Sequence, residues 1–119
     1  MDFEAYKYTP EEIRLRIKDL VEMQRSREEF SEETLAEFEA ILKEFVDNTV
    51  DKKDDKENIR QSAKAAIRKL NRANKKLDYE FIETDEREEL GEFFYMAGSY
   101  VGSYVGVDIR KLFDSARDW

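Results

Sequence analysis

The sequence predicts an all-α fold, built as a single-domain bundle of four to five helices. Apolar residues recur at helical spacing along most of the chain, and residues that favour helix starts precede these stretches. No stretch of useful length alternates apolar and polar residues as a half-buried strand would. The chain has 119 residues, eight Phe, six Tyr and one Trp. This is the length of one domain with ample apolar groups for a core, so we expect residues 1–119 to form one helical domain.

The first two helices have the clearest start signals. Thr9 and Pro10 predict a helix from Pro10 to about Arg25, because Thr caps helix starts and Pro suits the first helical position. Ser31 predicts the start of a second helix that runs to about Asn48. The residues expected on their buried faces are Ile13, Ile17, Leu20, Val21, Met23, Leu35, Phe38, Ile41, Leu42, Phe45 and Val46.

Two segments outside the helices are expected from their composition. Residues 1–8 form an aromatic N-terminal tail that we expect to fold back onto the body. Residues 51–56 (DKKDDK) contain no apolar side chain and predict a charged linker. A third helix is expected from Asp54 or Asp55 to about Lys76, and the alanines on its apolar face would let a neighbouring helix approach closely.

The last part of the chain predicts two more helices. Thr84 is expected to cap the fourth, and Asp108 is expected to cap a short fifth helix that ends near Trp119. Three glycines recur at four-residue intervals in this region: Gly98, Gly102 and Gly106. Each interior Gly costs about 1 kcal/mol relative to Ala, so a packing reason is needed. We expect another helix to cross closely over this strip, within the chain or in a second copy.

The missing residue types exclude several chemistries. Without Cys the chain has no disulfide and no thiolate nucleophile, and without His it has no Ser-His-Asp triad. No apolar run approaches the roughly 18 residues of a membrane span, and Met1–Glu4 does not resemble a secretory signal. We therefore expect a cytoplasmic protein without enzymatic activity, cofactor or bound metal.

Charge is distributed unevenly along the chain. The 29 acidic and 21 basic residues give a formal net charge of −8, but residues 51–76 alone carry +6. The cations of the expected third helix are Arg60, Lys64, Arg68, Lys69, Arg72, Lys75 and Lys76. They could form a nucleic-acid stripe, or a solvated face beside the acidic helices. We favour the solvated face and expect no direct nucleic-acid binding, because the overall charge would repel a phosphate backbone.

One acidic pattern suggests a metal-dependent enzyme as an alternative. The segment from Glu28 to Glu32 matches EExxE and is followed by Glu44 and Asp47, an order that resembles the all-α nucleoside-triphosphate pyrophosphatases. The resemblance implies that Glu28, Glu29, Glu32, Glu44 and Asp47 hold Mg²⁺ against a triphosphate. Family members place the two halves on separate helices, whereas Ser31 would place Glu32 and Glu44 on one helix, about 18 Å apart. The other interpretation is a set of ordinary helix-start acids.

A second resemblance suggests a binding protein. The run from Phe81 to Leu90 (FIETDEREEL) resembles a segment of small bacterial proteins, some of them similar to immunity proteins of contact-dependent or polymorphic toxin systems. The resemblance implies a small acidic immunity protein or antitoxin that covers a cognate toxin, often a basic nuclease. The partner-binding surface that we expect comprises the acids of two helix starts: Glu28, Glu29, Glu32, Glu33, Asp85, Glu86, Glu88 and Glu89.

A third interpretation is a structural or regulatory protein that associates with itself. In that case the strip of Gly98, Gly102 and Gly106 would pair with a second copy of the chain. A smooth glycine strip lets two helix backbones approach closely, whether the second helix belongs to the same chain or to another. The sequence leaves this choice open.

Overall fold

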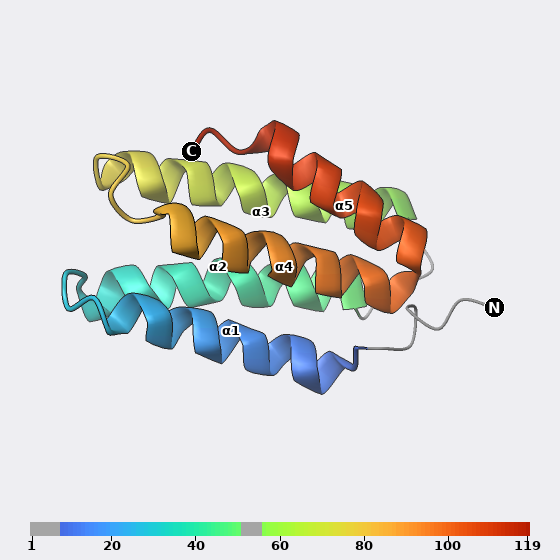
Figure 1. The fold of residues 1–119 in the computed structure, drawn as a ribbon, viewed down its shortest axis with the longest axis horizontal. Helices are drawn as coiled ribbons and strands as arrows, with labels where there is room; N and C mark the ends of the chain where they lie inside the picture. Colours follow the sequence, from blue (N-terminus) through green and yellow to red (C-terminus); the bar gives the residue numbers. More distant parts are fainter. Residues whose placement is uncertain (1–7, 51–55) are drawn as a thin grey trace.

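The computed structural model describes residues 8–50 and 56–119 and confirms the all-α fold. Its five helices are α1 (Pro10–Arg25), α2 (Glu32–Val50), α3 (Lys56–Lys76), α4 (Thr84–Val101) and α5 (Ser103–Ala116) (Figure 1). The described residues contain no strand. Most of the expected aromatic tail and residues 51–55 of the expected linker lie outside the described residues, whereas Lys56 is helical.

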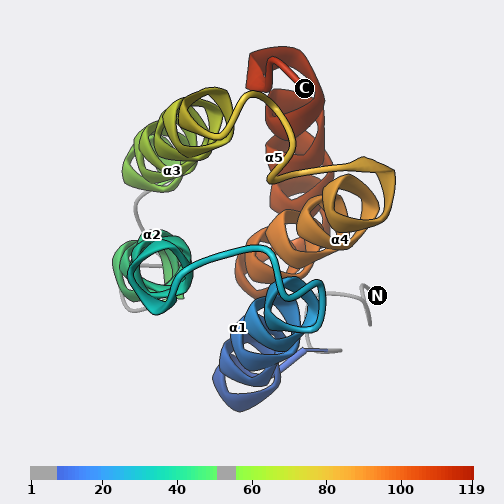
Figure 2. The same cartoon turned by 90° about the vertical axis from the view of Figure 1, so that its left-hand side faces the viewer.

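The five helices pack side by side in a ring. Seen from one end, the order around the ring is α1, α2, α3, α5 and α4, and α2 also contacts α4 (Figure 2). The bundle measures 45 × 25 × 22 Å, and its radius of gyration is 13.7 Å, the size of one compact domain of this length. None of the helices, over the residues described, combines the length and the apolar composition that a membrane span requires.

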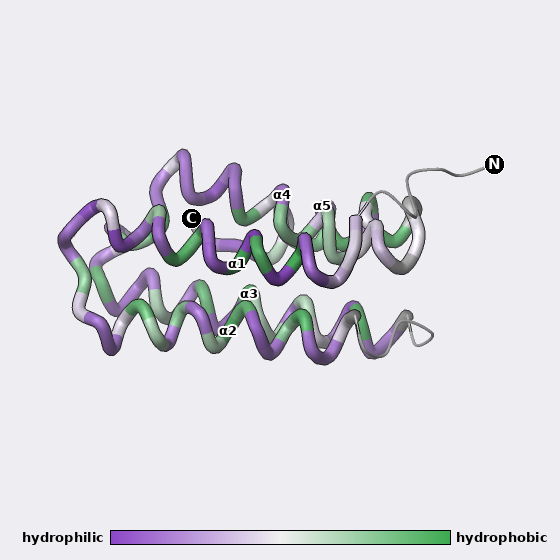
Figure 3. Tube along the Cα trace, turned by 90° about the horizontal axis from the view of Figure 1, so that it is seen from below, coloured by the Kyte–Doolittle hydropathy of each residue, from purple (hydrophilic) through white to green (hydrophobic). Residues whose placement is uncertain are grey.

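Aromatic rings fill the middle of the ring of helices. Phe94 lies 4.7 Å from Phe45 and 5.3 Å from Phe113, measured between ring centroids. The expected faces of α1 and α2 are buried, apart from Met23, which is half-buried. Hydrophobic and hydrophilic stretches alternate along each helix (Figure 3), as expected when one side faces the core. The last residue, Trp119, packs its ring on Phe113 at 5.4 Å.

The predicted caps of the first two helices are confirmed, and the predicted cap of the fourth helix is wrong. The Thr9 hydroxyl accepts a hydrogen bond from the Glu12 backbone N–H at 3.1 Å, and Ser31 caps α2 in the same way. For α4 the cap is Glu83, and Thr84 is the first helical residue. The reason is that Glu83 has a carboxylate three residues later, on Glu86, which accepts the Glu83 N–H at 3.0 Å.

The predicted boundary between the last two helices is also wrong. The fourth helix ends at Val101, Gly102 is extended, and α5 begins at Ser103, so Asp108 lies inside α5 instead of capping it. The break lets the two halves of the glycine strip face each other. A Cβ atom on Gly98 would lie 2.8 Å from the Gly106 Cα. The expected close crossing therefore exists, and it lies within the chain.

Candidate partner-binding site

The two acidic helix starts lie at the same end of the bundle. The chain leaves α1 and enters α2 there, and it leaves α3 and enters α4 there (Figures 1 and 2). We call residues 28–33 and 83–89 the acidic end. Negative side chains in first turns are stabilised by the positive end of the helix dipole, which accounts for their position in both helices.

Arg27 connects the two parts of the acidic end. Its guanidinium contacts three carboxylates and two backbone carbonyls, at distances between 2.6 and 3.0 Å: Glu29, Glu83 and Glu86, and the oxygens of Glu80 and Phe81. It also lies 4.7 Å from the centre of the Phe30 ring. The Arg27 side chain is only 17% exposed, and that of Glu86 only 8%. Arg27 therefore balances a carboxylate that would otherwise be buried without a cation.

Two more buried polar residues hold the loop between α3 and α4. The Gln24 amide on α1 donates to the Phe81 carbonyl at 2.7 Å. The Asn74 carbonyl oxygen on α3 accepts from the N–H groups of Phe81 and Ile82, at 3.1 and 2.8 Å. We call Gln24, Arg27 and Asn74 the polar clamp. Sequence reasoning missed it, although Gln24 and Asn74 each occupy an apolar-periodic position of their helix, a signal that could have found them.

Half of the eight predicted partner-binding acids are held by arginines. Arg27 pairs with Glu29 and Glu86, Arg25 pairs with Glu32, and Arg16 pairs with Glu89 at 3.1 Å. The hydrogen bond and charge of Glu32 raise the pKa of the Arg25 guanidinium above its ordinary value, so this pair keeps its cation. Glu86 is buried, which corrects its prediction as a surface residue, because its carboxylate turns inward to Arg27 and the Glu83 N–H.

The other four predicted acids are exposed and have no ion pair within the described part of the chain. We call them the free acidic set: Glu28, Glu33, Asp85 and Glu88. Two belong to the α1–α2 connection and the start of α2, and two to the start of α4. The polar clamp holds the backbone of Glu80, Phe81 and Ile82, directly before the helix that carries Asp85 and Glu88, and Arg27 of the clamp directly precedes Glu28.

The carboxylates of the alternative magnesium site are not brought together. Glu44 pairs with Lys69 at 2.9 Å and Asp47 pairs with Arg14 at 2.8 Å, both on the half of α2 remote from Glu32. Within residues 8–50 and 56–119, no group of three or more acidic side chains could hold a metal ion. The geometry thus gives the predicted magnesium cluster no support.

The glycine strip is occupied inside the molecule. Gly98, Gly102 and Gly106 are all buried, and a Cβ on Gly106 would lie 2.2 Å from the Ser99 hydroxyl oxygen. A second copy of the chain could therefore reach this strip only if α4 and α5 moved apart. Self-association through this strip stays a prediction, and it would require that separation.

The acidic end offers fixed negative charge and no assembled reaction centre. Its carboxylates are either paired with arginines or exposed singly, which suits the binding of cationic groups on another molecule. No protein-family model matches the chain, and no curated protein or solved structure matches it at a significant level.

Proposed function

We propose that this chain is a non-enzymatic binding protein that holds a basic surface of a partner protein at its acidic end. The observation that carries the proposal is the free acidic set, four exposed carboxylates without an ion pair among the described residues, at one end of the bundle. In the same region the two arginines of the α1–α2 turn, Arg25 and Arg27, form ion pairs with other carboxylates. The paired acids therefore stabilise the bundle through their ion pairs, and the four acids of the free acidic set are available to a partner.

The rigidity of the acidic end supports a binding role. The loop between α3 and α4 is held through its backbone at Glu80, Phe81 and Ile82 by the polar clamp. A surface that is ordered before binding loses less conformational entropy when the partner arrives. Complementary charge then increases the rate of encounter and selects basic partners.

The class of partner that we propose is a cognate toxin, which makes the chain an immunity protein or antitoxin acting in the cytoplasm. The resemblance of Phe81–Leu90 to immunity-type proteins falls on the clamped loop and the first turns of α4, the same region that carries Asp85 and Glu88. A nuclease is a fitting toxin, because an acidic surface can occupy a cleft built for phosphates.

A pull-down from the native cells tests this proposal with two matched variants. The site variant carries Glu28→Gln, Glu33→Gln, Asp85→Asn and Glu88→Gln. The control variant carries Glu11→Gln, Glu12→Gln, Asp19→Asn and Glu57→Gln, which are exposed acids outside the acidic end. Both variants change the formal charge from −8 to −4, and both remove acids from first turns of helices.

The proposal predicts one stoichiometric basic partner that is retained by the wild type and the control variant, is lost from the site variant and dissociates as salt rises. Equal retention by all three proteins would contradict the assignment of the surface. Release of pyrophosphate from a nucleoside triphosphate by the purified chain with Mg²⁺ would contradict the non-enzymatic class and favour the hydrolase alternative.

A further inference from the structure

The cations of α3 divide into two groups according to the direction they face. Three of the seven pair with acids of neighbouring helices: Arg60 with Asp108 at 3.4 Å, Lys69 with Glu44 at 2.9 Å, and Lys76 with Glu37 at 3.9 Å. These contacts agree with the interpretation of a basic helix beside acidic neighbours. They account for three of the seven cations, and the other four have no such ion pair among the described residues.

The remaining four cations form one continuous stripe. Lys64, Arg68, Arg72 and Lys75 follow each other at spacings of four, four and three residues, which places them on one side of α3 over about 16 Å. Lys64 is half-buried and the other three are exposed, and none has an ion pair within the described residues. We call these four residues the basic stripe. Acids outnumber bases by eight in this chain, so the stripe is unpaired although carboxylates are plentiful.

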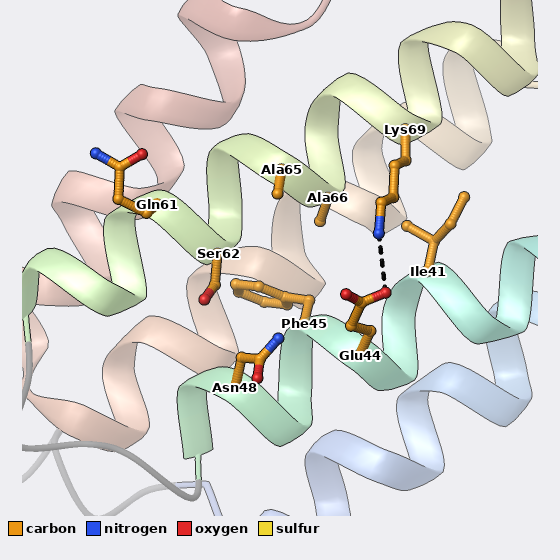
Figure 4. A pocket seen from close by; sticks show the side chains of 9 residues that line it. All are labelled: Ile41, Glu44, Phe45, Asn48, Gln61, Ser62, Ala65, Ala66 and Lys69. Carbon is orange, nitrogen blue, oxygen red and sulfur yellow. Dashed lines mark hydrogen bonds and ion pairs between the residues drawn. The ribbon is translucent and has the colours of Figure 1, made fainter.

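An apolar groove runs beside the basic stripe between α2 and α3. It has a volume of about 190 Å³, and Phe45, Ala65 and Ala66 contribute its apolar lining (Figure 4). That is the room of about six water molecules, enough for one aliphatic side chain. Ala65 is exposed and lies three residues before Arg68 on the same helix, so the edge of the groove adjoins the stripe at these two positions.

We propose that the basic stripe and this groove bind an acidic amphipathic helix of a partner protein. The carboxylates of that helix would lie on the stripe, and one of its apolar side chains would enter the groove. The bundle itself shows the pattern on the flank of α3 that faces α2, where the pair of Glu44 and Lys69 also borders the groove. There Glu37 and Glu44, seven residues apart on α2, meet Lys76 and Lys69, which are also seven apart.

The basic stripe repeats the same spacing on the open flank. Arg68 and Lys75 are seven residues apart, so a helix with acids at seven-residue intervals fits them as α2 fits Lys69 and Lys76. A nucleic-acid backbone fits less well. It would leave the apolar groove unused, it would find no exposed aromatic ring on the stripe or the groove rim for base stacking, and it would be repelled by the net charge of −8.

The test uses a synthetic peptide of about three heptads with Glu at seven-residue intervals and Leu on the adjoining positions. Its affinity is measured by fluorescence anisotropy at low salt for the wild type and two double variants of the full chain. The stripe variant carries Arg68→Gln and Arg72→Gln. The control carries Arg60→Gln and Lys76→Gln, which removes the same charge from the same helix where the cations are already paired.

We expect the stripe variant to bind the peptide about fivefold more weakly and the control to bind it like the wild type. A peptide with Ser in place of Leu should bind more weakly to all three proteins. Equal weakening of both double variants would overturn the proposal, because net charge alone would then govern binding. Tighter binding of an oligonucleotide of about 20 nucleotides than of the peptide would overturn it in favour of a nucleic-acid site. Neither variant changes the acidic end, so these results are independent of the proposed toxin binding.

Discussion

The chain turns at both ends of α4, and different interactions stabilise the two turns. Before α4 the loop of residues 77–83 is held by the polar clamp, whose Gln24 and Arg27 side chains donate to loop carbonyls and whose Asn74 side chain accepts from loop N–H groups. After α4 the single residue Gly102 separates two helices, and these pack through Gly98 and Gly106. The turn before α4 is stabilised by polar side chains, whereas the turn after α4 depends on two helix backbones that approach closely at glycines.

This difference determines what each turn can do. The clamped turn keeps its backbone fixed by buried groups and leaves exposed carboxylates around it, so it can present a binding surface. The glycine turn buries Gly98, Ser99, Gly102 and Gly106, so these small residues are not exposed to a partner. Both turns should be important for stability, but only changes near the clamped turn should alter binding.

The largest loss of stability should follow Arg27→Ala. This change removes the cation beside the buried Glu86 and releases the carbonyls of Glu80 and Phe81. Breaking a buried, hydrogen-bonded ion pair costs about 3 kcal/mol or more in the free energy of unfolding, measured by urea denaturation.

A matched control is Lys43→Ala, which removes the exposed pair with Glu39 and should cost about 0.5 kcal/mol or less. Equal losses for the Arg27 and Lys43 variants would show that the clamp does not stabilise its turn.

The glycine turn should respond to a single methyl group. In Gly98→Ala the new Cβ would meet backbone atoms of Gly106 and Val105 at 2.8 and 3.0 Å, and backbone cannot rotate away. We expect a loss of about 2 kcal/mol, read from thermal unfolding. In Gly91→Ala the Cβ meets only the flexible end of Arg110, so this variant should be neutral or gain up to about 1 kcal/mol from helix propensity. Equal losses of stability in the two variants would contradict crowding by the Gly106 backbone as the cause of the loss at Gly98.

The smallest expected effect is a gain of stability in the clamped loop. Asp78 has φ of 58° and ends α3 with its N–H bonded to the Lys75 carbonyl, a position where glycine is preferred. Asp78→Gly should raise stability by about 1 kcal/mol, or the melting temperature by about 4 °C. Alanine does not adopt positive φ as readily as glycine, so Asp78→Ala should not gain this stability. An equal gain for the Ala and Gly variants would contradict backbone strain as the cause.

The sequence predicts the close crossing at the glycines better than the contacts of the polar clamp, although it places the start of the fifth helix at Asp108 and not at Ser103. Helix periodicity and the interval of Gly98, Gly102 and Gly106 are local patterns, so the five helices and a close crossing could be inferred from them. Two of the three clamp residues, Gln24 and Arg27, reach residues more than fifty positions away, such as Phe81 and Glu83, and no local pattern indicates which arginine reaches which acid. For the same reason the eight predicted acids could not be divided into paired and free ones.

Glycine placement adds a second lesson. None of the described glycines has positive φ, whereas Glu28, Asp78 and Tyr79 do. The acidic end and the loop before α4 therefore place non-glycine residues where glycine would be less strained, and one of them, Glu28, belongs to the free acidic set. Such strain persists only where the surrounding structure fixes the backbone, and at Tyr79 the N–H donates to the Asn74 backbone carbonyl at 2.8 Å.

Binding at the acidic end is tested most directly by isothermal titration of the basic partner, once captured, into the wild type and the two quadruple variants at fixed salt. We expect neutralisation of Glu28, Glu33, Asp85 and Glu88 to weaken binding at least about tenfold, because charge complementarity at the site is lost. The control variant, with the same net charge, should bind within about twofold of the wild type. Equal affinities for the two variants would show that the acidic end is not the binding surface.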